Sequence, residues 1–273
     1  MTAPDETTRE LKGIHQQLNL FWIALAFFSR IPVPASTEFS QSNLNHASRY
    51  FPAVGWLIGC LCAAVLWATS TLFSIEIAVL LSMVVSLLLT GCFHEDGLAD
   101  SADGMGGGWT VEQKLNIMKD SRIGTYGSVA LWASLSLKFM ALSQLADPVI
   151  ALVVAHPLSR VIPTIFIRYM PYVSDTDTSK AKPLAEAGSS ADTWIAVVIG
   201  GAALCLVPNV FVWLVLVLVG VGLASYLFLH KQLKGFTGDT LGAVQQVTEL
   251  AIYLTLLAAA SNAGVVVTMG TAG

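Results

Sequence analysis

The sequence predicts an all-α integral membrane protein with about seven transmembrane helices, preceded by an N-terminal interfacial or re-entrant helix. Of the 273 residues, 55% are hydrophobic and only 12% are charged, whereas about 25% of the residues in a soluble domain are charged. The mean hydropathy is +0.68, and the apolar residues lie in runs of about 20, the length that crosses a bilayer. Because composition does not change abruptly along the chain, residues 1–273 are expected to form one membrane domain.

Apolar segments follow one another along most of the chain. The first, from Leu18 to Pro34, is interrupted by Arg30 and closed by two prolines. This leaves about a dozen uninterrupted apolar residues, a length that favours a helix in the membrane interface or a re-entrant helix. Seven longer runs are each predicted to form a spanning helix; they cover residues 51–73, 75–93, 125–146, 148–170, 193–207, 209–229 and 247–268.

Basic residues lie in alternate connections between these runs, which predicts the topology. Short loops rich in Lys and Arg stay on the cytoplasmic side of a membrane. The N-terminus and the long loops are therefore expected inside and the C-terminus outside. The basic residues that carry this prediction are Arg49, Lys114, Lys119, Arg122, Lys180, Lys182, Lys231 and Lys234.

The charge of the chain argues against nucleic-acid binding, and the spacing of its cysteines argues against a zinc site. The formal net charge is −4 and the chain has no block of Lys and Arg, so nucleic acid is not an expected partner. Cys60, Cys62, Cys92 and Cys205 form no CxxC pair and have no histidine at a zinc-site spacing. The expected partners are membrane lipid and small molecules handled at the cytoplasmic face.

Residues 94–124 form an acidic, glycine-rich segment that we expect to be cytoplasmic and catalytic. It begins HEDGLADSADGMGGGW, which places Asp96, Asp100 and Asp103 at positions i, i+4 and i+7. In a helix these carboxylates share one face, where like charges repel and favour a bound cation. Carboxylate oxygens suit Mg²⁺, so the three aspartates are the predicted catalytic and metal-binding residues; the alternative is a solvated acidic loop. His94, at the end of the preceding run, is a candidate for substrate binding.

Glycines and a short amphipathic helix accompany the aspartates. Gly97 and Gly104 remove side chains beside the carboxylates and allow a ligand to approach closely. Thr110 begins a capping-box pattern that predicts a helix with one apolar side. We expect this helix to lie against the membrane surface and to present Asp120 and Arg122 beside the acidic face.

Other polar residues occur near or inside the apolar runs. Lys234 and Asp239 lie in the glycine-containing stretch HKQLKGFTGDTLGA, which is suited either to bind phosphate or to form a basic anchor and turn. Asp239 or Glu249 is also suited to add a metal ligand. Arg160 and Lys138 lie inside apolar runs, where an ionisable residue is costly without a partner. Arg160 is expected to contact either the ligand or a structural partner. Lys138 is expected either to extend its charged end to the membrane interface or to be structurally paired.

Several of these segments together resemble the cobalamin synthase family, the adenosylcobinamide-GDP ribazoletransferases. The resemblance rests on HEDGLADSADG and IMKDSRIGTYG, on FFSRIPVP and RYFPAVGWLIG before them, and on HPLSRVIP and GFTGDTLGA after them. It extends from about residue 20 to the last apolar run, with the motifs in the same order.

The resemblance implies a Mg²⁺-dependent transferase. The implied reaction joins adenosylcobinamide-GDP to α-ribazole or its 5′-phosphate and releases GMP, at the cytoplasmic face of a bacterial inner membrane. The family's acidic motif falls on Asp96, Asp100 and Asp103, and its later motifs fall on Asp120, Arg122 and Asp239.

Two other functions are alternatives on the sequence alone. Spaced aspartates with glycine are similar to the CDP-alcohol phosphotransferases of phospholipid synthesis, but Asp100 stands where their motif has an arginine. A transporter is the second alternative, although transport sites usually lie near the bilayer midplane in repeated broken helices. The sequence leaves open whether the acceptor carries a 5′-phosphate, which base it carries, and whether the protein is a monomer or a homo-oligomer.

Overall fold

The computed structural model describes residues 6–173 and 189–262, and these residues fold almost entirely into helices. The only bridge between extended residues in this part of the chain joins Tyr172 to Phe236. The α-helices are α1 (Glu6–Phe28), α2 (Gln41–Ala47), α3 (Phe51–Ser70), α4 (Ile75–Thr90), α5 (Phe93–Gly107), α6 (Val111–Met118), α7 (Thr125–Gln144), α8 (Pro148–Leu158), α9 (Val161–Tyr169), α10 (Ser190–Gly201), α11 (Phe211–Leu233) and α12 (Gly238–Asn262). Short 3₁₀ helices are η1 (Ser48–Tyr50), η3 (Ala202–Leu206) and η4 (Pro208–Val210).

The predicted all-α membrane fold is confirmed, whereas the predicted count of about seven spans is not. Within the described residues, four helical segments are long and apolar enough to cross a bilayer: Gln41–Ser70, Pro148–Tyr169, Pro208–Leu233 and Gly238–Ala260. A fifth is added if α4 and α5 form one bent span. The predicted run at 193–207 overlaps Ser190–Leu206, an apolar helical stretch too short to be a candidate span. Helix α7, which covers most of the run predicted at 125–146, carries Lys138 and several serines. Lys180 and Lys182, which helped to predict the topology, lie outside the described residues.

The N-terminal segment behaves as its interrupted apolar pattern predicts. Helix α1 ends at Phe28, before Arg30 and the prolines. It is not among the helices of the described chain that could span a membrane. An interfacial or re-entrant helix is consistent with this arrangement.

Small residues allow the central helices to approach closely. A Cβ atom built on Gly55 of α3 would lie 2.5 Å from the carbonyl oxygen of His156 in α8. A Cβ on Gly59 would lie 2.8 Å from the carbonyl oxygen of Leu152. Such backbone contact is typical of membrane helices, in which packing rather than hydrophobic burial holds neighbours together.

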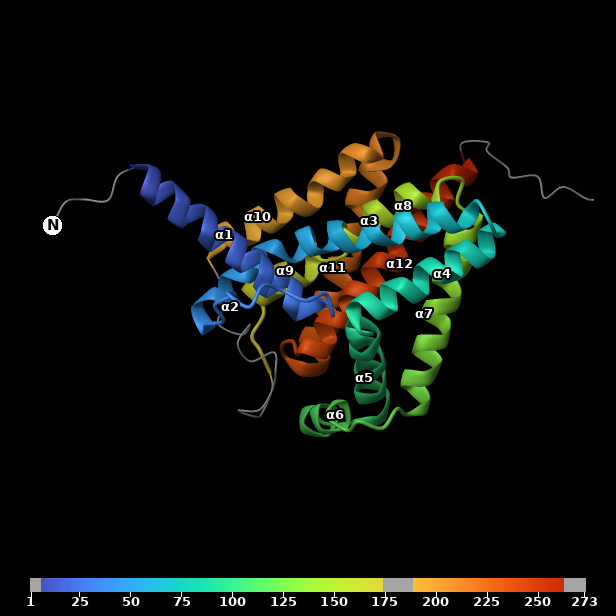
Figure 1. Ribbon diagram of the computed structural model, residues 1–273. Coiled ribbons are helices and arrows are strands. Elements are labelled where there is room, and N and C mark those ends of the chain that lie inside the picture. Colours follow the sequence, from blue (N-terminus) through green and yellow to red (C-terminus); the bar gives the residue numbers. More distant parts are fainter. Residues whose placement is uncertain (1–5, 174–188, 263–273) are drawn as a thin grey trace, which may run out of the picture.

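An elbow between α4 and α5 directs the acidic segment away from the bundle. Gly91 ends α4 in the left-handed region with φ +61°, a conformation that glycine adopts without steric cost. Cys92 follows with φ +57°, and α4 and α5 meet at an angle of 85°. Figure 1 shows α5 projecting from the bundle with α6 near its far end, so the elbow places the carboxylates at one edge of the molecule.

Candidate active site

Helix α5 brings the three predicted aspartates to one face, as expected. The segment from Phe93 to Gly107 is helical throughout, so positions i, i+4 and i+7 lie on one side. Asp96 is exposed, Asp100 is half-buried and Asp103 is buried. The face therefore runs from solvent into the protein.

Asp239 reaches this face because α5 and α12 cross in backbone contact. A Cβ on Gly97 would lie 2.6 Å from the carbonyl oxygen of Asp239. On the other helix, a Cβ on Gly242 would lie 3.4 Å from the Cα atom of Gly97. Gly97 is thus needed for helix packing, and it places the first turn of α12 beside the aspartates.

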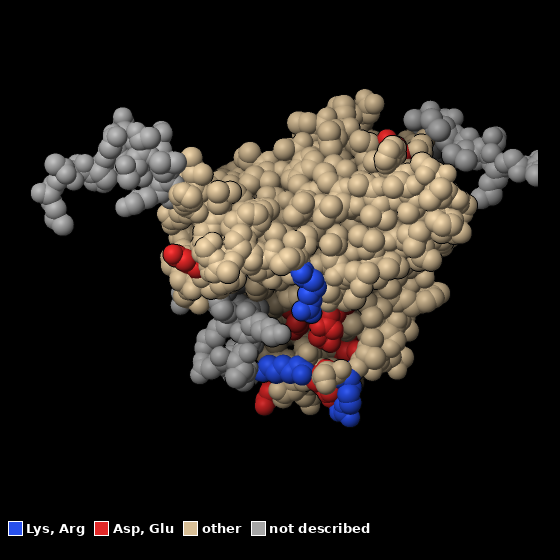
Figure 2. Space-filling model, viewed as in Figure 1, with Lys and Arg blue, Asp and Glu red and all other residues tan. Residues whose placement is uncertain are grey.

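The carboxylates of this crossing repel one another. Asp100 experiences charge repulsion from Asp96, Asp239 and Asp103, and Asp239 experiences it from Asp96. Figure 2 shows acidic side chains in a hollow at the lower part of the molecule, with basic side chains around it. Such a concentration of negative charge needs a cation or a positively charged group to be stable when ionised.

Asp103 has a structural task that the sequence did not predict. Its Oδ2 accepts a hydrogen bond from the backbone N–H of Gly124 at 2.7 Å, and its Oδ1 accepts one from Gly127 at 2.9 Å. A Cβ on either glycine would collide with this carboxylate. Asp103 therefore fastens α5 to the start of α7; the glycines of the string RIGTYG were the signal for this contact.

The donor chemistry of the site fits Mg²⁺, although the described residues include no group of three His, Cys, Asp or Glu placed to hold a metal ion. Mg²⁺ is usually bound by one or two carboxylates, with waters and substrate phosphates completing its shell. Asp96, Asp100 and Asp239 offer such oxygens at the helix crossing. Metal binding by all three of Asp96, Asp100 and Asp103 stays a prediction, and both oxygens of Asp103 already accept backbone hydrogen bonds.

Helix α6 forms as its capping box predicts. The Thr110 hydroxyl accepts from the Gln113 N–H, and the Gln113 side chain accepts from the Thr110 N–H. Gly104 lets α6 lie against α5, because a Cβ there would be 2.6 Å from Cγ of Met118. Lys114 Nζ donates to the side-chain oxygen of Gln232 at 2.5 Å and so ties α6 to α11.

Asp120 and Arg122 bind each other in the loop after α6. Arg122 Nη2 lies 2.6 Å from Asp120 Oδ2, and Nε lies 3.1 Å from Oδ1. The hydrogen bond from Arg122 lowers the pKa of the Asp120 carboxyl to about 2. Arg122 is exposed and its loop leads to Gly124, so the pair lies in the connection that Asp103 holds.

Lys234 occupies the turn between α11 and α12. It is exposed and ends α11 in the left-handed region with φ +65°. Three and six residues later, the hydroxyls of Thr237 and Thr240 each accept a hydrogen bond from the other's backbone N–H group. This local cap starts α12 at Gly238, which puts Asp239 in its first turn.

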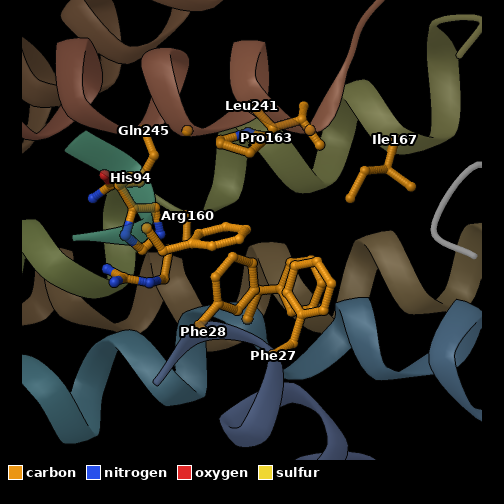
Figure 3. Close-up of a pocket in the computed structure, with 12 residues that line it drawn as sticks. Phe27, Phe28, His94, Arg160, Pro163, Ile167, Leu241 and Gln245 are labelled. Carbon is orange, nitrogen blue, oxygen red and sulfur yellow. The ribbon is translucent and has the colours of Figure 1, made fainter. Parts of the chain in front are cut away.

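His94 and Arg160 lie behind the acidic face, inside the bundle. Both side chains are buried, and with Gln245 they line a cavity of about 20 Å³, enough for about one water molecule. Figure 3 shows these three side chains near one another, with the rings of Phe27 and Phe28 close by. Arg160 Nη1 donates to the His156 carbonyl oxygen at 2.7 Å, and His94 stacks on Phe28 with ring centres 5.4 Å apart.

The structure shows no contact of His94 or Arg160 with the aspartates. Two of their buried nitrogen atoms, His94 Nε2 and Arg160 Nε, have no hydrogen-bond partner in the described protein. Substrate binding by these two residues remains a prediction. The observed contacts of Arg160 favour its structural alternative.

A buried polar network connects α5 to α7 and α12. Lys138 Nζ lies 2.9 Å from Glu249 Oε1, so of the two alternatives predicted for Lys138 the structural pairing is the one observed. Glu249, suggested above as an additional metal ligand, is engaged in this ion pair. Lys138 also donates to Gln246 Oε1 at 3.1 Å, and Gln246 Nε2 donates to Glu95 Oε1 at 3.0 Å. The sequence did not predict the roles of Glu95 and Gln246, because their contacts join residues about 150 positions apart.

Comparison with known proteins places the chain in a family. Residues 20–257 match the family model described as cobalamin-5-phosphate synthase. The chain is 48% identical over 261 residues to an adenosylcobinamide-GDP ribazoletransferase of Shewanella frigidimarina, covering 91% of this chain and 97% of the relative. Proteins of the same name from Vibrio parahaemolyticus and Shewanella pealeana are 48% and 52% identical, with 91% and 90% of this chain and 96% and 98% of the relatives covered. No solved structure matches the chain. The match over most of the chain, together with these relatives, shows that this protein belongs to the cobalamin-5-phosphate synthase family.

Proposed function

We propose that this protein is a Mg²⁺-dependent adenosylcobinamide-GDP ribazoletransferase that acts at the cytoplasmic face of a bacterial inner membrane. The transferase assignment rests on family membership and on relatives of that name. The observation that carries the chemistry is the α5–α12 crossing, which gathers Asp96, Asp100 and Asp239 where α5 leaves the bundle.

The reaction exchanges the phosphoanhydride linkage of the diphosphate for a new phosphate ester linkage. A ribose hydroxyl oxygen of the α-ribazole acceptor forms a bond to the phosphorus nearer the corrinoid. The bond from that phosphorus to the bridging oxygen breaks, and this oxygen leaves with its electron pair as part of GMP. The hydroxyl proton passes to a carboxylate, and such transfers depend mainly on positioning and charge neutralisation.

The residues of the crossing fit this chemistry. Bound Mg²⁺ would neutralise phosphate charge and orient the diphosphate, with Asp96, Asp100 and Asp239 as the candidate ligands. One of these carboxylates accepts the hydroxyl proton. Asp103 holds the α5 helix against α7, so that the other carboxylates keep their relative positions. Gly97 keeps α5 and α12 in contact.

GMP release from adenosylcobinamide-GDP tests this proposal. The purified protein in liposomes is supplied with α-ribazole or its 5′-phosphate, with and without Mg²⁺, and GMP and the corrinoid product are measured. Release should require both Mg²⁺ and the acceptor. Asp96→Asn and Asp100→Asn should each lower the rate on the order of a hundredfold or more.

Glu76→Gln is a matched control for the aspartate variants. Glu76 is an exposed carboxylate in the first turn of α4, outside the residue set of the crossing. The Glu76→Gln substitution should leave the rate of GMP release unchanged. Folded wild-type protein that released no GMP would overturn the proposal, and normal turnover by both aspartate variants would overturn the assigned site.

A further inference from the structure

Arg30 is attached to the elbow from which the acidic helix begins. Its backbone N–H donates to the Leu89 carbonyl oxygen at 2.7 Å, which fixes it to the end of α4. Its guanidinium lies over Gly91, where a Cβ atom would be 3.2 Å from Cζ and closer still to Nε. The missing side chain of Gly91 thus provides the space that the guanidinium occupies.

Arg30 differs from the other arginines whose side chains the structure describes. Arg30 is exposed, and its guanidinium has neither a hydrogen bond nor an ion pair with any described residue. The other arginines each have a partner: Arg49 pairs with Asp192, Arg122 with Asp120 and Arg160 with the His156 carbonyl oxygen, and Arg168 lies over the Tyr169 ring. The cationic end of Arg30 is therefore available to an external anion, while its backbone is held in place.

The acidic helix starts two residues after Gly91. The Asp96 N–H makes the first helical bond, to the Cys92 carbonyl oxygen at 2.8 Å, so Asp96 lies one turn beyond the elbow. Arg30 and the carboxylates therefore flank the same end of α5. An anion that bridges them would have one end near a cation bound by carboxylates and the other near a guanidinium.

We propose that Arg30 binds the nucleotide-side phosphate of the diphosphate substrate and stabilises the charge on GMP as it leaves. This inference rests on the proposed function and adds a binding residue to it. Arginine suits the task because its planar guanidinium can donate two parallel hydrogen bonds to one phosphate. As the bond to the bridging oxygen breaks, its electron pair and negative charge pass to GMP, whose phosphate the guanidinium already contacts.

Kinetics of Arg30→Ala and Arg30→Lys in liposomes test the proposal. Loss of a hydrogen-bonded charge at the phosphate should weaken inhibition by added GMP and reduce kcat/KM for adenosylcobinamide-GDP by about 10- to 100-fold. The KM for the α-ribazole acceptor and the thermal stability should not change. Arg30→Lys should keep part of the activity, because it retains the charge without the paired donors. Added guanidinium ion should partly restore the activity of Arg30→Ala.

Lys119→Ala is the matched control. Lys119 is another exposed cation, placed at the end of α6, and its removal should leave both substrate constants unchanged. Active wild-type protein with an Arg30→Ala variant of equal kcat/KM and equal GMP inhibition would overturn the role of Arg30. An increase in the acceptor KM alone would overturn it as well. Failure of the proposed function itself would differ, because wild-type protein would then release no GMP.

Discussion

Removing one partner of the buried Lys138–Glu249 ion pair should destabilise the protein strongly. In Lys138→Met, the Glu249 carboxylate keeps the hydrogen bonds from Gln245 and Tyr253, at 2.6 and 3.2 Å, but loses its cation. An unpaired buried charge costs about 3–5 kcal/mol. At about 2–4 °C of Tm per kcal/mol for a chain of this size class, the variant should melt about 6–20 °C lower.

A double variant separates this charge effect from a simple packing defect. Lys138→Met with Glu249→Gln removes both charges and keeps an acceptor oxygen for Tyr253, and replacing both members of a buried ion pair is often nearly neutral. The double variant should therefore recover most of the lost stability. Thermal unfolding of the purified proteins in one detergent gives the comparison. A Lys138→Met protein as stable as the wild type, or a double variant less stable than both single variants, would refute the reasoning.

Three further predictions concern the active-site helix. Gly97→Ala should reduce both activity and stability, because its Cβ would lie 2.6 Å from the Asp239 carbonyl oxygen and overpacking costs about 1–3 kcal/mol. The control Gly220→Ala, whose Cβ would meet nothing within 4 Å, should change neither activity nor stability. A Gly97→Ala protein with the same Tm as the wild type would contradict the tight crossing of α5 and α12. Asp103→Asn should lower the Tm by about 2–12 °C, since it leaves a buried backbone N–H without its acceptor at a cost of about 1–3 kcal/mol; an unchanged melting curve would show that the two hydrogen bonds contribute nothing. Asp100→Asn should raise the Mg²⁺ concentration needed for half-maximal activity, as measured by GMP release over a Mg²⁺ titration, and an unshifted titration would exclude Asp100 as a ligand.

Local sequence rules predicted much of the helix structure. The capping pattern at Thr110 predicted α6, the spacing of the aspartates predicted a shared face on α5, and the cost of a charge in an apolar run predicted a partner for Lys138. Each of these rules depends on residues close in sequence or on the membrane itself. They required no knowledge of which helices are neighbours.

Tertiary contacts account for what the sequence did not predict. In the sequence, Asp103 looked as suitable a metal ligand as Asp96 and Asp100. In the structure, its carboxylate accepts hydrogen bonds from two backbone N–H groups that are 21 and 24 residues away. Arg160 lies among buried side chains because α9 packs inside the bundle. The apolar sequence around Arg160 does not show whether this residue lies in the bundle interior or beside the aspartates. The predicted count of about seven spans is not confirmed, because in the described part of the chain some of the predicted runs form helices that are too short or too polar to be candidate spans.

The length of α4 has a consequence for the surrounding lipid. Its 16 residues extend about 24 Å at 1.5 Å per residue, less than the hydrocarbon thickness of about 30 Å. A helix that stops short of the far interface creates a hydrophobic mismatch, which the bilayer relieves by thinning or by admitting water next to polar groups. If α4 lies across the bilayer, the elbow at its end would let aqueous solvent reach below the ordinary headgroup level. Under the proposed function, the acyl-chain length of the surrounding lipid should then influence how readily the nucleotide substrate reaches the carboxylates.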